Sequence, residues 1–157
     1  MNKKMVLGMM TLFLSWASIF GKTLVINPNT VATTMTADAI TYAWQRKSFY
    51  ANSRLWVFYS DGTNMVYQTS ADGFTWTSAT SIRTVYHGYM FSVWFDGTYL
   101  HYACANPPLA DKILYRRGTP NSNGTITWST SEQTVVTASI YNVNVFVSVD
   151  SLGYPWI

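Results

Sequence analysis

Residues 54–76 read RLWVFYSDGTNMVYQTSADGFTW, and this stretch decides the fold of the chain. Residues 54–59 are rich in aromatic and β-branched side chains, which favour strands, and a second run of this kind covers residues 65–70. Asp61-Gly62 separates the two runs and Asp72-Gly73 follows the second. Such pairs readily supply the positive φ that tight hairpin turns need. The stretch therefore predicts two successive β-hairpins, which form a meander.

The composition also indicates an all-β protein. The 157 residues are 17% aromatic and 11% charged, whereas about 25% of residues are charged in typical soluble proteins. Aromatic and β-branched residues are too plentiful for a disordered chain. The length suits one domain or part of a larger one.

Residues 1–21 have the layout of a secretory signal peptide, because Lys3 and Lys4 precede an uncharged, largely apolar run. An uncleaved N-terminal anchor is the alternative, although the run is shorter than the about 20 apolar residues of a spanning helix. We expect residues 22–157 to form the folded part of a protein that is secreted or held in the cell envelope. Cys104 is the one cysteine, so export without a disulfide points to a prokaryote.

The charge balance gives little support to nucleic-acid binding. Without Lys3 and Lys4 the basic residues fall from 10 to 8 against 7 acidic ones. The remaining net charge is about +1, and Arg116-Arg117 is the one basic cluster that is left. We therefore expect no nucleic acid among the partners.

A related pattern returns twice along the chain. Residues 48–56 align with residues 92–100, so that the turn Asn52-Ser53 stands over Asp96-Gly97. A third copy begins at residue 145, turns through residues 150–153 and resumes at Tyr154. Self-similarity at intervals of tens of residues indicates stacked or radial repeats.

Each of the two complete repeats is expected to hold four strands. In the first repeat we predict strands at residues 47–51, 54–59, 64–70 and 75–82. In the second we predict strands at residues 91–95, 98–103, 112–117 and 125–136. Four-stranded units about 40 to 55 residues apart are typical of β-propeller blades. A sandwich shows the same alternation but has no reason to repeat its turns unit by unit.

We thus predict an all-β fold, an incomplete β-propeller of four-stranded antiparallel blades, with two full blades and part of a third. A propeller closes with roughly four to eight blades. We expect the chain to be the N-terminal portion of a longer propeller, and assembly between subunits is the alternative.

Residues 70–76, Ser-Ala-Asp-Gly-Phe-Thr-Trp, resemble the Asp-box, or bacterial neuraminidase repeat, of sialidase-family propellers. That motif runs Ser-x-Asp-x-Gly-x-Thr-Trp, so this copy is one residue short. Residues 119–128 hold a degenerate version with Asn in place of Asp. The resemblance covers residues 46–157. It implies that the motif is structural and lies on the face away from the active site, with the members Ser70, Asp72, Gly73, Thr75 and Trp76.

The opposite end of the repeats, where second hairpins and connections between blades meet, is the rim where propeller ligands usually bind. The candidate residues on this rim are Asp38, Arg46, Asp61, Arg83, His87 and Asp111. Trp44, Tyr86 and Tyr89 are aromatic candidates for stacking on sugar rings, and packing between blades is their simpler role.

Arg46 is the most informative of these candidates. Sialidases resemble one another in an early arginine that binds the substrate carboxylate, and Arg46 stands in the corresponding place, without the neighbouring aromatic, Ile and Pro. Our alignment places Met90 at the matching position of the second repeat, so Arg46 is not a repeat consensus. We assign substrate binding to Arg46 and Arg83, and a solvated rim arginine is the alternative reading.

Glycoside hydrolysis normally needs a general acid and a second carboxylate or a tyrosine. Asp61 is the candidate acid/base, although Ser60-Asp61-Gly62-Thr63 also suits a hairpin turn. By the resemblance, the nucleophilic Tyr and its Glu would lie in later blades. His87 and His101 are too isolated to indicate a metal site, so we expect neither a metal nor a cofactor.

Our leading hypothesis is an exported sialidase-like propeller module that recognises glycans or another cell-surface polymer. One alternative is an exo-acting glycoside hydrolase of the sialidase type, in which this portion alone is inactive. The other is a structural or adhesion propeller without catalysis.

Overall fold

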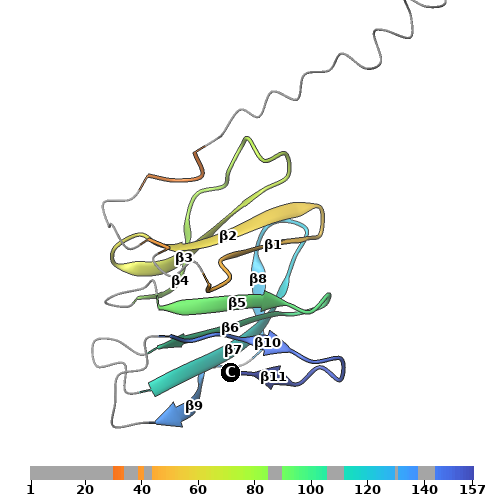
Figure 1. Ribbon diagram of the computed structural model, residues 1–157. Helices are drawn as coiled ribbons and strands as arrows, with labels where there is room; N and C mark the ends of the chain where they lie inside the picture. The colour runs from red at the N-terminus through yellow and green to blue at the C-terminus, as the bar shows by residue number, and fades with distance from the viewer. Residues whose placement is uncertain are drawn as a thin grey trace, which may run out of the picture.

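The computed structural model describes residues 30–33, 39–40, 44–84, 90–105, 112–129, 131–137 and 144–157. The regular structure of these residues consists of β-strands in antiparallel sheets, so the predicted all-β class is confirmed (Figure 1). None of them belongs to a helix long and apolar enough to cross a membrane. The predicted leader and five rim candidates lie outside the described residues: Asp38, Tyr86, His87, Tyr89 and Asp111.

The first sheet is a meander in which each strand pairs with the next one along the chain. Its strands are β1 (Ser48–Ala51), β2 (Arg54–Ser60), β3 (Asn64–Ser70) and β4 (Thr80–Thr84). The first three follow the predicted ranges closely, but the fourth begins five residues later than predicted. Thr77 explains the delay, because its hydroxyl accepts the Thr69 N–H at 3.0 Å and so replaces a backbone partner.

The second sheet differs from the first in its outer strand. Its strands are β5 (Phe91–Phe95), β6 (Leu100–Ala105), β7 (Lys112–Pro120), β8 (Ile126–Trp128) and β9 (Gln133–Thr137). The single strand predicted at residues 125–136 is therefore wrong, because β8 and β9 pair with opposite ends of the long β7. Between them, Ser129 ends the first ladder by donating both its N–H and its hydroxyl to the Arg117 carbonyl.

A third unit consists of the short antiparallel strands β10 (Ser148–Val149) and β11 (Pro155–Trp156). Figure 1 shows the two sheets stacked on each other, with this hairpin beside the second sheet. Alternate residues of a strand face opposite sides of its sheet, so the second sheet contacts a neighbour on each face.

The larger core lies between the two sheets. Trp56 and Phe58 of β2 are fully buried and pack in one cluster with Phe91 and Tyr102 of the second sheet. Phe49 of β1 stacks on Phe95 of β5, with ring centroids 5.1 Å apart. Such aromatic packing accounts for the high aromatic content.

A second core joins the second sheet to the third unit. Val145 and Val147 are buried against Met90 and Ala103. The Gln45 side chain donates a hydrogen bond of 2.8 Å to the Val145 carbonyl, which ties the first repeat to the third.

The first hairpins of the three units share one hydrogen-bond pattern. In each hairpin, the aromatic residue two positions after the residue that closes the turn donates a ring N–H to the residue that opens the turn. The bonds join Trp56 Nε1 to the Ala51 carbonyl (3.1 Å), His101 Nε2 to Asp96 Oδ2 (2.8 Å) and Trp156 Nε1 to Asp150 Oδ2 (3.0 Å). The structure thus repeats in three dimensions, and Trp56, His101 and Trp156 are equivalent.

This equivalence corrects the sequence alignment by one residue. The hydrogen bonds set Ala51 over Asp96, whereas the sequence placed Asn52 there. The counterpart of Arg46 is therefore Phe91, which is fully buried, and not Met90. Arg46 still departs from the repeat, because it places an exposed cation where the next unit has a core residue.

Candidate functional site

Arg46 lies two residues before β1, at the end of the sheets where β5 also begins. Its carbonyl accepts a hydrogen bond of 2.9 Å from the Val93 N–H, which holds the starts of β1 and β5 together. Its exposed side chain places Cζ 3.8 Å from the centroid of the Trp94 ring. This geometry is a cation–π contact.

The Arg46 guanidinium is well placed for an external anion. Among the described residues, none forms a hydrogen bond or ion pair with this group. A guanidinium over an indole face keeps N–H donors that can match a carboxylate through two parallel hydrogen bonds. Trp44, in the same segment, is 59% exposed and adds aromatic surface.

Lys47 points in the opposite direction, into the space between the sheets. Its Nζ lies 3.4 Å from the centroid of the Phe91 ring and donates to the Phe91 carbonyl and to Gln45 Oε1, the latter at 3.1 Å. Burial lowers the pKa of this amine to about 7. Sequence reasoning passed over Lys47, although strand alternation beside an exposed Arg46 was a signal for an inward cation.

Arg83, the second predicted substrate ligand, is part of a network between the sheets. Its Nη2 lies 3.1 Å from Glu132 Oε1, and its Nη1 lies 3.4 Å from the Cys104 sulfur. The Tyr102 hydroxyl donates to the other oxygen of Glu132. Arg83 thus has internal partners, which supply a structural role, and its substrate role stays a prediction.

The titratable groups around Glu132 are unsuited to attack on a substrate. Burial, followed by the hydrogen bond to Glu132, strongly raises the pKa of Tyr102, whose side chain is 1% exposed. Burial also raises the pKa of the Cys104 thiol to about 12, although Arg83 opposes the shift. A nucleophile needs access and a lowered pKa. The network therefore holds the two sheets together.

Asp61 forms the turn between β2 and β3. Its Oδ1 accepts the N–H groups of Thr63 (2.8 Å) and Asn64 (2.6 Å). Partial burial raises the pKa of the Asp61 carboxyl, but these hydrogen bonds outweigh it, so that the pKa is lowered overall. A general acid at neutral pH needs a raised pKa. The geometry gives Asp61 a turn role, and its catalytic role stays a prediction.

The predicted substrate and acid/base residues share one end of the sheets but not one cluster. Arg46 precedes β1, Asp61 follows β2, and Arg83 pairs with Met65 near the same turn. Within the described part of the chain, no hydrogen bond or ion pair joins any two of the three.

The Asp72 hairpin, residues 70–77, lies at the other end. Asp72 Oδ1 accepts the N–H groups of Thr75 (2.7 Å) and Phe74 (2.8 Å) and the Ser70 hydroxyl, and these bonds lower the pKa of the Asp72 carboxyl to about 2. Gly73 takes a φ of 76°, which side chains disfavour. The local geometry is that of a self-contained turn.

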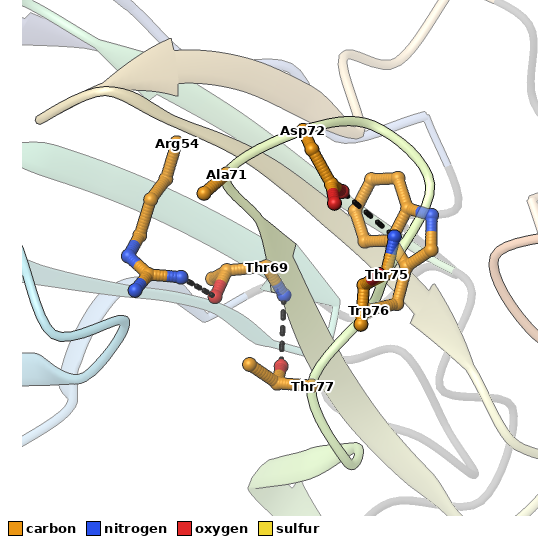
Figure 2. Close-up of a pocket in the computed structure, with 7 residues that line it drawn as sticks. All are labelled: Arg54, Thr69, Ala71, Asp72, Thr75, Trp76 and Thr77. Atoms are coloured by element: carbon orange, nitrogen blue, oxygen red, sulfur yellow. Dashed lines mark hydrogen bonds between the residues drawn. The ribbon is translucent and has the colours of Figure 1, made fainter.

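A cavity of about 290 Å³ adjoins this hairpin (Figure 2). Its lining consists of Arg54, Thr69, Ala71, Asp72, Thr75, Trp76 and Thr77. Figure 2 shows Arg54 and Trp76 on opposite sides of Thr69. Arg54 is already engaged, since its Nε donates to the Ser122 carbonyl at 2.6 Å and its Nη1 lies 3.4 Å from Thr69 Oγ1. The cavity is thus lined by the first sheet alone, and its arginine is already bonded to a hairpin of the second sheet. Arg46 is the stronger candidate.

The described residues contain no group of three or more His, Cys, Asp or Glu side chains that could hold a metal ion. Comparison with known proteins returned no matching family model, curated protein or solved structure. The chemistry of the site therefore rests on its own geometry.

Proposed function

We propose that the chain is a portion of a sialidase-like β-propeller in which each four-stranded sheet is a blade. Three observations support this architecture: the strand order of the first sheet, the repeated turn hydrogen bonds, and the contacts of β5 with β1 on one side and with β10 on the other. A radial array brings the first strands of successive blades together in this way.

The proposed function is recognition of glycans or another cell-surface polymer by an exported protein. The observation that carries it is the exposed Arg46 guanidinium, which is stacked on Trp94 with its hydrogen-bond donors available at the rim. An anionic sugar offers a carboxylate for these donors and a ring face for nearby aromatic surface. The leader expected at residues 1–21 supports a secreted or envelope location.

Binding of the full chain to a glycan array that includes sialylated and uronic-acid glycans tests the proposal. We expect Arg46→Ala to weaken binding to acidic glycans at least about tenfold, which corresponds to about 1.4 kcal/mol. Arg46→Lys should recover part of the loss, because an ammonium keeps the charge but not the two-point geometry.

Arg117→Ala is the matched control. Arg117 is also an exposed arginine over an aromatic ring, with Cζ 4.5 Å from the centroid of Tyr99. Its loss should leave glycan binding unchanged. Equal binding by wild type and Arg46→Ala would contradict the proposal and favour a structural propeller. Cleavage of a fluorogenic sialoside by the complete protein, including the later blades that the resemblance implies, would favour the exo-glycosidase instead.

A further inference from the structure

Gln45, immediately before Arg46, is a buried polar residue at a position where the second unit has an apolar one. It is 3% exposed. The hydrogen bonds that make Phe91 the counterpart of Arg46 also make Met90 the counterpart of Gln45, and Met90 packs in the second core. Burial of an amide costs free energy unless hydrogen bonds compensate it, whereas a methionine fills a core without that cost. The contacts of Gln45 therefore indicate a role beyond packing.

Both ends of the Gln45 side-chain amide are engaged. Its Nε2 donates to the Val145 carbonyl of the third unit at 2.8 Å, and its Oε1 accepts a hydrogen bond of 3.1 Å from Lys47 Nζ. An ammonium only donates and a carbonyl only accepts, so these two partners fix the orientation of the amide. Lys47 in turn donates to the Phe91 carbonyl. The amide thus connects the third unit with the contact between the first two sheets, directly beside Arg46.

The Arg46 carbonyl provides a second anchor, through its hydrogen bond of 2.9 Å from the Val93 N–H. Trp94, whose ring lies under the guanidinium, is the next residue after Val93. The Trp94 side chain packs against the second core, to which Val145 belongs. Gln45 is therefore bonded to the same core that supports the Trp94 ring. These contacts fix the start of the Arg46 side chain relative to the ring on which it ends.

We propose that Gln45 is a positioning residue, which holds Arg46 so that its guanidinium stays on the Trp94 ring and presents its N–H donors to a carboxylate. An arginine loses rotamer freedom when it binds a ligand, and a side chain that is already held loses less. Gln45 thus raises the affinity for an acidic glycan without contacting it. Its effect on binding rests on the proposed function, whereas the positioning of Arg46 is measurable without a ligand.

The NMR chemical shifts of the Arg46 side-chain protons measure this positioning, because the ring current of an indole moves protons above its face to lower frequency. Trp94→Leu in the full chain gives the Arg46 shifts without the ring. Gln45→Met keeps the length of the side chain and removes both hydrogen bonds, so it should move the Arg46 shifts toward those of Trp94→Leu. It should also weaken binding of sialyllactose about fivefold, which is less than the loss expected for Arg46→Ala.

Gln68→Met is the matched control, because Gln68 is also a buried amide with two hydrogen bonds and is 8% exposed. Its Oε1 accepts the Tyr59 hydroxyl at 2.6 Å, and its Nε2 donates to the Thr77 carbonyl at 2.5 Å. These bonds lie within β2, β3 and the Asp72 hairpin. The substitution should cost comparable stability in urea unfolding, yet leave the Arg46 shifts and the binding of sialyllactose unchanged.

Arg46 shifts in Gln45→Met that equal those of the wild type would overturn the inference. An equal change in Gln68→Met would do the same, because general loosening of the fold would then be the cause. So would altered Arg46 shifts in Gln45→Met with unchanged affinity for sialyllactose, in a protein whose binding Arg46→Ala weakens. If the wild type bound no acidic glycan, the proposed function would fail, whereas Arg46 shifts that depend on Gln45 would still establish the positioning.

Discussion

Arg83 of the first sheet and Glu132, which immediately precedes β9 of the second, form an ion pair with Nη2 3.1 Å from Oε1. Their side chains are 19% and 22% exposed. Glu132 also accepts the hydroxyl of the buried Tyr102. A single carboxylate therefore satisfies a cation and a hydroxyl from different sheets, and the stability of the contact depends on it.

Glu132→Ala should lower the free energy of unfolding by about 1–3 kcal/mol, because it leaves both partners without their acceptor. Urea unfolding of the full chain measures the change. Glu132→Gln is the matched control, since its amide oxygen can still accept the Tyr102 hydroxyl, and its cost should be smaller. An unchanged midpoint for Glu132→Ala would show that water satisfies both partners.

Lys47 should make stability depend on pH near neutrality. Burial lowers the pKa of this amine from 10.5 to about 7, so between these values the unfolded chain binds more protons than the folded one. Stability therefore rises with pH above about 7, with a slope of at most about 1.4 kcal/mol per pH unit. Cys104, whose pKa is raised from 9.0 to about 12, has the opposite effect above pH 9.0.

Chemical unfolding of wild type and Lys47→Met between about pH 6 and pH 9 measures the contribution of Lys47 to the pH dependence of stability. The slope above about pH 7 should disappear in Lys47→Met and persist in Lys112→Met, a control on β7. An identical slope in all three proteins would refute the assignment to Lys47.

Asp72→Ala should open the Asp72 hairpin locally, because Phe74 and Thr75 lose the acceptor of their N–H groups. Hydrogen exchange at these two amides should become faster, while the amides of β2 and β3 keep their protection. Asp72→Asn retains an acceptor oxygen and should exchange at an intermediate rate. The wild-type hairpin should loosen only as the pH falls from 3.8 toward 2, since the hydrogen bonds from Thr75 and Phe74 lower the Asp72 pKa to about 2.

Gly118→Ala should destabilise the second sheet by about 1–3 kcal/mol through overpacking. A Cβ at this position would lie 2.7 Å from both Ile126 Cγ2 and Trp128 Cε3, on the paired strand β8. Thermal unfolding measures the effect, and Thr119→Ala on the adjacent exposed position is the control. If both variants unfolded at the same temperature, β8 would have to shift away from β7 with little loss of free energy of folding.

Much of the fold was predictable because its determinants are local. Alternating aromatic and β-branched residues define β2 and β3, and Asp61-Gly62 closes the turn between them. The fourth strands were mispredicted because their pairing depends on contacts outside the local sequence. Thr77 interrupts the first sheet with a side-chain hydrogen bond, and β7 is long enough to pair with two separate strands.

The candidate site was predictable in part. The sequence singled out Arg46 as a departure from the repeat. It also placed Arg46, Asp61 and Arg83 at the same end of the sheets. It did not identify Trp94 as the partner of Arg46 or Glu132 as the partner of Arg83, because each contact joins residues that are distant along the chain. The alignment error of one residue arose because Asp96 was matched with Asn52, the first residue inside its turn, whereas the hydrogen bonds show that Asp96 opens its turn as Ala51 does.

The sequence by itself determined the strand-rich class, the repeated hairpins and the turn at Asp72, because backbone propensity and short-range hydrogen bonds specify all three. Tertiary structure decided which cations face outward and which are buried. Arg46 stacks on a ring at the surface, whereas Lys47, the next residue, enters the space between the sheets. A strand directs successive side chains to opposite faces, and what each face meets is set by the packing of one sheet on another.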